Sequence, residues 1–114
     1  MNSGCLFCKI VIGTIPAEKI FEDEVSIAIR DINPQAATHI LVLPREHIES
    51  LAEVGPDQTE LLGKLVANAA EIARKHKLDR GYRLVVNTGR EGGQTVNHLH
   101  LHVLGGRHMT WPPG

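Results

Sequence analysis

The sequence predicts a small α+β domain in which an antiparallel sheet packs against one long helix. Apolar residues recur at helical spacing over 57–77, and short segments of alternating apolar and polar residues occur on both sides of that stretch. Strand-rich segments flanking a single helix are typical of this class. The 114 residues suit a single domain, which we place at residues 1–114.

The first three predicted strands lie in the N-terminal half. Residues 20–21 precede a turn at 22–24, and residues 25–30 then alternate between apolar and small or polar side chains, as expected of a hairpin with one buried face. The segment 31–34 contains Asn and Pro, which favour turns and end the second strand. A third strand is expected over 39–43.

The long helix is expected over 57–77, and the basic residues of its last turn suit the negative end of the helix dipole. Two further strands are expected over 82–87 and 98–104. A polar, glycine-rich loop at 88–95 connects them. The prediction is therefore about five antiparallel strands with one long helix and one or two short ones.

Charge and composition argue against several kinds of partner. A net charge of −1 gives no basic field for a nucleic-acid backbone, and one Trp, one Tyr and two Phe leave few platforms for base stacking. We therefore expect no nucleic-acid partner. No apolar run approaches the roughly 20 residues of a membrane span, and residues 1–5 do not resemble a signal peptide. We expect a cytoplasmic protein with no membrane partner.

The most informative segment contains His98, His100 and His102, which alternate with apolar residues. Alternate side chains of a strand project to one face, so the three imidazoles are expected together, with the apolar side chains facing the core. Neighbouring rings would stand roughly 6 to 7 Å apart, a spacing that can hold a phosphate group.

Imidazole suits chemistry at phosphorus. With an unperturbed pKa of about 6.5 it is largely neutral at pH 7 and can attack without prior deprotonation. A covalent intermediate divides a transfer into two displacements, and flanking rings can donate to phosphate oxygens. The nearby segment 92–95 offers backbone N–H groups and a hydroxyl as an anion cradle.

Two other interpretations of these histidines stay open. Histidines at positions i, i+2 and i+4 can also bind a catalytic metal, and spacing alone does not separate a nucleophile from a ligand. Chance surface histidines are the least favoured interpretation, because the opposite face is uniformly apolar and the neighbouring loop is rich in glycine.

The pattern His-φ-His-φ-His-φ-φ, where φ is apolar, is the motif of the histidine triad (HIT) superfamily, and the chain resembles this family over nearly its whole length. The other matching segments occur in the family's order at 7–10, 15–17, 31–36, 38–44 and 92–95. The endings at 104–107 and 111–114 are similar to those of the HINT branch, the histidine triad nucleotide-binding proteins, rather than to those of dinucleoside polyphosphate hydrolases.

This resemblance implies a HIT fold that dimerises into a continuous sheet. It also implies purine nucleoside phosphoramidase activity, in which the P–N bond of a purine nucleoside 5′-phosphoramidate is cleaved through a nucleotidyl-histidine intermediate. The implied ligands are purine nucleoside monophosphates and phosphoramidates, and no cofactor is required for catalysis. Alternatives are a dinucleoside polyphosphate hydrolase and a nucleotide-binding interaction protein with little turnover.

The resemblance assigns roles by position. His100 is the nucleophile, His102 contacts the phosphate and leaving group, and His98 supports His100 through its backbone carbonyl. His39 matches the family's fourth active-site histidine, and Asp31 binds the ribose hydroxyls, although taken singly Asp31 also suits a turn cap. The implied base pocket, whose members singly also suit plain core, comprises Leu6, Phe7, Ile10, Ile15, Ile29 and Ile32. The residues implied for the phosphate end are Asn87, Gly93, Gln94 and Thr95.

The only cysteines, Cys5 and Cys8, have the spacing of half a zinc site. The resemblance supplies His47 and His98 as the remaining ligands of a structural Cys₂His₂ zinc, which would make His98 a scaffold rather than a catalyst. The alternative is a pair of buried free cysteines that behave as small hydrophobic residues.

Overall fold

The computed structural model describes residues 4–114 and contains five strands and two α-helices in that range. The strands are β1 Lys19–Glu22, β2 Ser26–Arg30, β3 Thr38–Pro44, β4 Tyr82–Val85 and β5 Leu101–Gly105. The helices are α1 Leu6–Val11 and α2 Thr59–Lys75, with short 3-10 helices at Leu51–Glu53 and Pro56–Gln58. Strand order in the single sheet is β1-β2-β3-β5-β4, and every neighbouring pair is antiparallel. The predicted α+β class and antiparallel sheet are confirmed.

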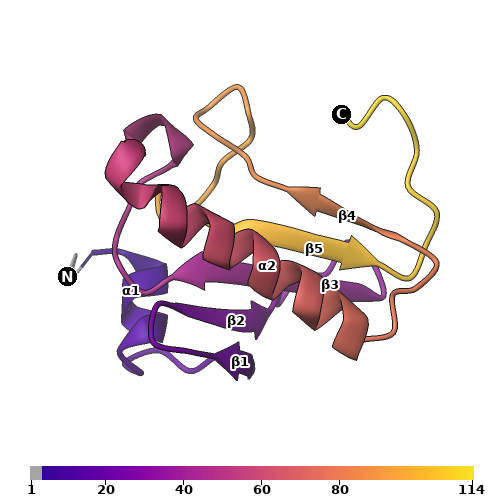
Figure 1. Ribbon diagram of the computed structural model, residues 1–114, viewed down its shortest axis with the longest axis horizontal. Helices are drawn as coiled ribbons and strands as arrows, with labels where there is room; N and C mark the ends of the chain where they lie inside the picture. The colour runs from indigo at the N-terminus through magenta and orange to yellow at the C-terminus, as the bar shows by residue number, and fades with distance from the viewer. Residues whose placement is uncertain (1–3) are drawn as a thin grey trace.

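Helix α2 crosses one face of the sheet (Figure 1). The residues of the sheet that face it alternate along each strand, as a period of two requires. Ala28 in β2, Ile40 in β3 and Val103 in β5 pack in one cluster with Leu65 and Ile72 of α2. All five side chains are almost completely buried, so this layer is the main hydrophobic core.

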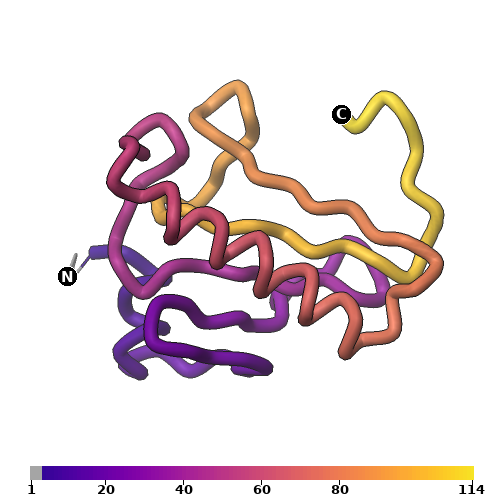
Figure 2. Tube along the Cα trace, in the orientation of Figure 1, coloured from indigo at the N-terminus to yellow at the C-terminus, as the bar shows by residue number. Residues whose placement is uncertain are grey.

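The opposite face of the sheet packs against α1. A second hydrophobic cluster forms there from the strand residues that point away from α2, among them Ile27, Ile29 and Leu41. Phe7 and Ile10 of α1 complete it. Helix α1 is capped at its N-terminus by Cys5, whose Sγ accepts from the backbone N–H of Cys8 at 3.3 Å. This second core therefore depends on a short N-terminal helix that lies at the other end of the molecule from the C-terminal tail (Figure 2).

The last strand is shorter than predicted. Its pairing with β3 ends at Val42 and Leu101, so the predicted strand over 98–104 was wrong for its first three residues. Beyond that pair the carbonyl of Pro44 accepts from the side chain of His98 at 2.8 Å, and the N–H of Leu99 donates to Ile48 at 2.7 Å. Pro44 has no N–H to donate to a ladder. The first two motif histidines therefore lie in an irregular segment before β5.

The other boundaries differ by a few residues. The long helix begins at Thr59 and ends at Lys75, inside the predicted 57–77, because a 3-10 turn precedes it. Strand β4 ends at Val85 rather than at residue 87. Within residues 4–114, no helix combines the length and apolar character that crossing a bilayer would require.

Candidate active site and metal-binding cluster

Four histidines lie on the face of the sheet opposite α2 or next to that face. His39 in β3 and His102 in β5 alternate with core residues of those strands, so their rings point away from the long helix. His98 and His100, in the segment before β5, are buried. The ring centroids of His100 and His102 are 5.0 Å apart, and those of His39 and His102 are 5.1 Å apart.

The ring of His100 is held by a short hydrogen bond to the backbone. Its Nδ1–H donates to the carbonyl oxygen of His98 at 2.6 Å. A carbonyl oxygen can only accept, so the proton of the neutral ring sits on Nδ1 and the lone pair sits on Nε2. Phe7 packs edge-on against the same ring, with centroids 5.0 Å apart and planes at 89°. The ring is thus fixed both in tautomer and in orientation.

His39, His102 and Asp31 form a second polar group. His39 Nε2 lies 2.9 Å from His102 Nδ1 and 3.4 Å from Asp31 Oδ2. The backbone N–H of Gln35 donates to His39 Nδ1 at 3.0 Å. Sequence reasoning missed Gln35, because a contribution from a backbone amide leaves no signal in residue type.

These histidines are neutral at pH 7. Burial lowers the pKa of His39, partly offset by the charge of Asp31. Burial also lowers the pKa of His100, although its bond to the His98 carbonyl favours the charged form. Burial, together with the rings of His100 and His39, lowers the pKa of His102 to about 4. An uncharged ring keeps the lone pair that a nucleophile needs.

A cavity of about 420 Å³ opens beside the histidines. Ten of the thirteen predicted nucleotide-site residues line it, which are Leu6, Phe7, Ile10, Ile15, Ile29, Asp31, Ile32, Thr95, His100 and His102. His39 lines it as well. The prediction missed several lining residues, which include Pro16, Ala17, Asn33, Gln35, Leu41 and Val96. The wall thus combines an apolar surface from α1 and β2 with a carboxylate and three imidazoles.

Three predicted phosphate-end residues, Asn87, Gly93 and Gln94, do not line this cavity. The Gln94 amide braces its own loop instead: its Oε1 accepts from the N–H of Gly89 at 3.0 Å, and its Nε2 donates to Glu49 at 2.7 Å. Gln94 therefore shapes the loop that brings Thr95 to the cavity wall.

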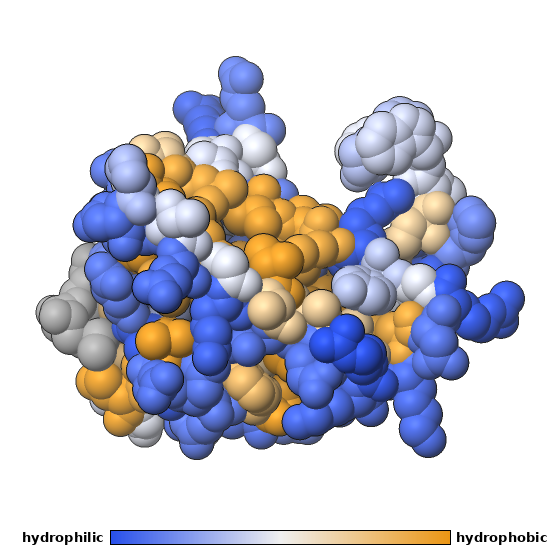
Figure 3. All heavy atoms as spheres, in the orientation of Figure 1, coloured by the Kyte–Doolittle hydropathy of each residue, from blue (hydrophilic) through white to orange (hydrophobic). Residues whose placement is uncertain are grey.

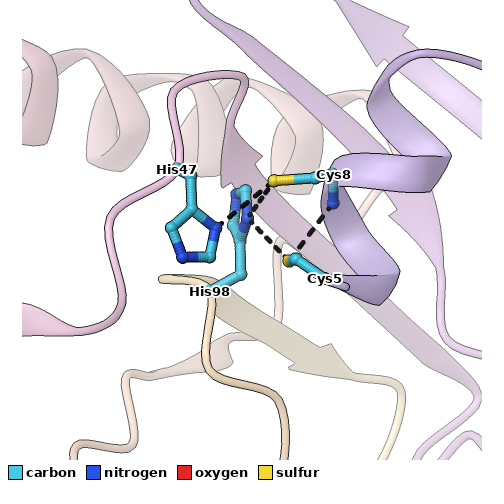
Figure 4. A group of neighbouring side chains, drawn as sticks. All are labelled: Cys5, Cys8, His47 and His98. Atoms are coloured by element: carbon cyan, nitrogen blue, oxygen red, sulfur yellow. Dashed lines mark hydrogen bonds between the residues drawn. The ribbon is translucent and has the colours of Figure 1, made fainter. Parts of the chain in front are cut away.

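The backbone carbonyl of His98 contacts His100 as the resemblance implies, but the His98 ring does not lie beside those of His100 and His102 at the cavity, as the alternation of the motif predicts. Its Nε2–H donates to the carbonyl of Pro44 at 2.8 Å, so Nδ1 carries the lone pair. That lone pair faces Cys5 Sγ at 3.4 Å and Cys8 Sγ at 3.6 Å (Figure 4). The three motif histidines therefore do not converge on one point, and a metal held by all three is not supported.

The cysteines, His98 and His47 form a compact group of four metal-ligand atoms that lie within 4.8 Å of one another. Cys8 Sγ and His47 Nδ1 are 3.3 Å apart. A tetrahedral zinc with ordinary Zn–S and Zn–N bonds places sulfur and nitrogen about 3.6 Å apart. The three S···N distances are close to that value, so the residues fit a Cys₂His₂ ion, and no disulfide joins Cys5 to Cys8.

The pKa of His102 predicts an acid-dependent loss of stability. An unfolded histidine has a pKa of about 6.5, so below that pH the unfolded chain binds this proton before the folded one does. The stability that neutral His102 contributes should be fully present above about pH 6.5 and should fall as the pH drops toward the folded pKa of about 4. His102→Gln should lessen this decline in Tm, as measured by thermal unfolding between about pH 7.5 and 4.5.

The exposed His108 offers a control, since His108→Gln should leave the decline of the wild type unchanged. An equal pH dependence of Tm in wild type and His102→Gln would contradict the prediction. Comparing the Tm of the variants with that of the wild type at each pH cancels the contributions of the other buried histidines to the pH dependence of Tm.

The chain is similar to proteins of a known family. The HIT domain model matches residues 13–109. An uncharacterized HIT-like protein of Synechococcus elongatus is 47% identical over the whole of both chains. A 14 kDa zinc-binding protein of Zea mays is 45% identical over 99% of this chain and 90% of its own.

Solved structures of similar proteins have the same fold. A HIT family hydrolase from Legionella pneumophila Philadelphia 1 has 52% identity and a TM-score of 0.95, covering 96% of this chain and 99% of its own. A histidine triad protein from Clostridium difficile has 37% identity and a TM-score of 0.93, covering 96% of each chain. The predicted HIT fold is confirmed, and the chain belongs to the HIT domain family.

Proposed function

We propose that this protein hydrolyses the P–N bond of purine nucleoside 5′-phosphoramidates through a nucleotidyl intermediate on His100. The observation that carries the proposal is the 2.6 Å bond from His100 Nδ1 to the His98 carbonyl, which leaves a neutral Nε2 lone pair on a ring that lines the cavity. A HIT family hydrolase shares 52% of the sequence, which favours an enzyme. A histidine triad nucleotide-binding protein from Candida albicans shares 30% over 95% of this chain, with a TM-score of 0.80, which favours a nucleotide ligand and the HINT branch.

The chemistry proceeds in two displacements. His100 Nε2 forms a bond to phosphorus as the P–N bond breaks, and the departing nitrogen takes a proton from solvent. Water then attacks the nucleotidyl-histidine, which releases the monophosphate, restores His100 and returns a proton to solvent. One water is consumed for each bond cleaved. His102 contributes a hydrogen bond to the phosphate or to the leaving group.

The cavity wall supports a position for each part of the ligand. The apolar side chains of Phe7, Ile10 and Ile29 suit a purine ring, and the Asp31 carboxylate suits the ribose hydroxyls. Thr95 and His102 suit the phosphate. Gln94 supports the phosphate end indirectly through its loop, and direct contacts from Asn87 and Gly93 stay predictions.

The nucleophile can be tested by trapping the intermediate. Single-turnover cleavage of an adenosine 5′-phosphoramidate, quenched early and analysed by intact-protein mass spectrometry, should show one nucleotidyl adduct on the wild type. His100→Ala should show none and should lose turnover by roughly a thousandfold or more, because no other group supplies the bond to phosphorus.

His76→Ala is the matched control, since His76 lies at the end of α2 and does not line the cavity. It should keep both the adduct and the turnover. Wild-type turnover in His100→Ala would overturn the mechanism. Tight binding of adenosine monophosphate with neither adduct nor turnover would instead favour a nucleotide-binding interaction protein.

We further propose that Cys5, Cys8, His47 and His98 hold a structural zinc ion. Support comes from the S···N spacings, from the His98 lone pair that faces both sulfurs, and from the zinc-binding relative in Zea mays. The ion would cross-link α1 to the sheet and fix the backbone around His98. It takes no part in the proposed bond changes.

Zinc content tests this site directly. Elemental analysis of protein purified without chelator should give about one zinc per chain, as expected for a structural site. His47→Ala should lower that content, whereas His76→Ala should not. Less than about a tenth of an equivalent in folded wild-type protein would contradict the proposal.

Strand β4 offers an edge along which the implied homodimer can form. This strand is at one end of the sheet, so its outer edge is free to pair with a second copy and to extend the sheet. Apolar surface gathers between α2 and β4 (Figure 3), and Val66 of α2 is 50% exposed. We propose that two copies join through this surface.

Sedimentation equilibrium should therefore give about twice the 12.5 kDa of one chain. Val66→Glu should shift the mass toward the monomer, because it places a charge in the apolar interface. Lys64→Glu, an exposed position on the same helix, provides the control. A monomeric wild type at micromolar concentration would contradict the interface.

A further inference from the structure

Two hydrogen bonds determine where the protons of neutral His39 and His102 sit in this structure. The backbone amide of Gln35 can only donate, and it donates to His39 Nδ1 at 3.0 Å, so neutral His39 carries its proton on Nε2. That Nε2–H lies 2.9 Å from His102 Nδ1, which must accept. Neutral His102 therefore carries its own proton on Nε2 and offers it from a ring that lines the cavity.

The same His39 proton has a second acceptor. Asp31 Oδ2 lies 3.4 Å from His39 Nε2, and the Asp31 side chain is only 19% exposed. Its other oxygen, Oδ1, accepts from the N–H of Asn33 at 2.8 Å. Asp31 and His102 thus compete for one hydrogen bond from His39, and both competitors line the cavity.

The positions of these three residues would also suit a metal ion, since their donor atoms lie within 4.8 Å of one another. A metal on His39 Nε2 would require the proton of that ring to move to Nδ1. The Gln35 N–H points at Nδ1, so two donors would then face each other. The cluster is therefore better described as a branched hydrogen bond than as a metal site.

We propose that ribose hydroxyls bound at Asp31 leave the Nε2–H of His39 available to hydrogen-bond to His102. Recognition of the sugar then holds His102 in the tautomer whose Nε2–H faces the phosphate. This inference rests on the proposed function, which places the ribose at Asp31. Hydroxyl groups that donate to the carboxylate occupy its lone pairs and weaken its hold on His39. His39 is thus a positioning residue that acts through His102.

Without the hydroxyls, Asp31 competes for the proton of His39. Whenever Asp31 takes this hydrogen bond, His102 loses the donor at its Nδ1 and can adopt the other tautomer, with its proton on Nδ1. In that form Nε2 presents a lone pair to an anionic phosphate, which is repulsive. A sugar without hydroxyls should therefore slow the chemical step as well as weaken binding.

The first test compares kcat and KM for an adenosine 5′-phosphoramidate and its 2′,3′-dideoxy counterpart. In the wild type, kcat should fall about tenfold for the dideoxy substrate, the effect expected from weakening one hydrogen bond. A change confined to KM would overturn the coupling, because it would show that the hydroxyls contribute only to binding. This comparison needs no variant.

Two variants of His39 test the route. His39→Met removes the donor, so its kcat should be low and nearly equal for the two sugars, while KM still rises for the dideoxy substrate. His39→Gln can place an amide N–H near the position of the ring Nε2, so it should restore part of the dependence of kcat on the sugar. The same kcat ratio in His39→Met as in the wild type would overturn the role of His39.

A spectroscopic measurement separates this inference from the proposed activity. ¹⁵N NMR of the histidine rings, with adenosine monophosphate or its 2′,3′-dideoxy analogue bound, reports which nitrogen of His102 carries the proton. The Nε2–H form should be more populated with the ribose. Equal populations would overturn the coupling even if turnover is normal, and a clear difference would support it even if no phosphoramidate is cleaved. Absence of nucleotide binding would overturn both proposals.

Discussion

The hydrogen bond between His100 Nδ1 and the carbonyl of His98 is the contact on which the rest of the site depends. At 2.6 Å it fixes the proton of the buried ring and leaves Nε2 with its lone pair. The carbonyl itself is held in place because the His98 side chain is engaged at both nitrogens, by Pro44 on one side and by the cysteines on the other. The ring of His100 is therefore oriented by a residue whose own ring is turned toward Cys5 and Cys8.

This arrangement ties the two halves of the site to one short helix. Cys8, which faces His98, and Phe7, which packs against both His98 and His100, are neighbours on α1. Ile10 of the same helix lines the cavity. A displacement of α1 would thus disturb the Cys/His cluster, the apolar wall of the cavity and the ring of His100 together. The long helix α2 is separated from these groups by the sheet, because alternate residues of β3 and β5 face opposite ways.

Much of the fold follows from the sequence, and the exceptions have physical causes. Strand alternation and the apolar face of α2 are local patterns, so the class and the strand count could be predicted. The start of β5 could not, because it depends on tertiary bonds from His98 and Leu99 to the segment after β3. Most of the cavity wall could be predicted through family resemblance. The contribution of Gln35 could not, because it comes from the backbone amide, which any residue except proline would supply.

The four histidines show why residue type alone does not assign a role. A backbone carbonyl bonded to one ring nitrogen leaves a lone pair on the other, and this is the case for His98, which faces sulfur, and for His100. A backbone amide bonded to one nitrogen has the opposite effect: it makes His39 a donor at Nε2, and His39 in turn makes His102 a donor. Backbone groups do not titrate near neutral pH. The roles of His98, His100 and His39 are therefore set by backbone groups of the fold and persist for as long as the rings stay neutral, whereas the role of His102 depends on its hydrogen bond from His39.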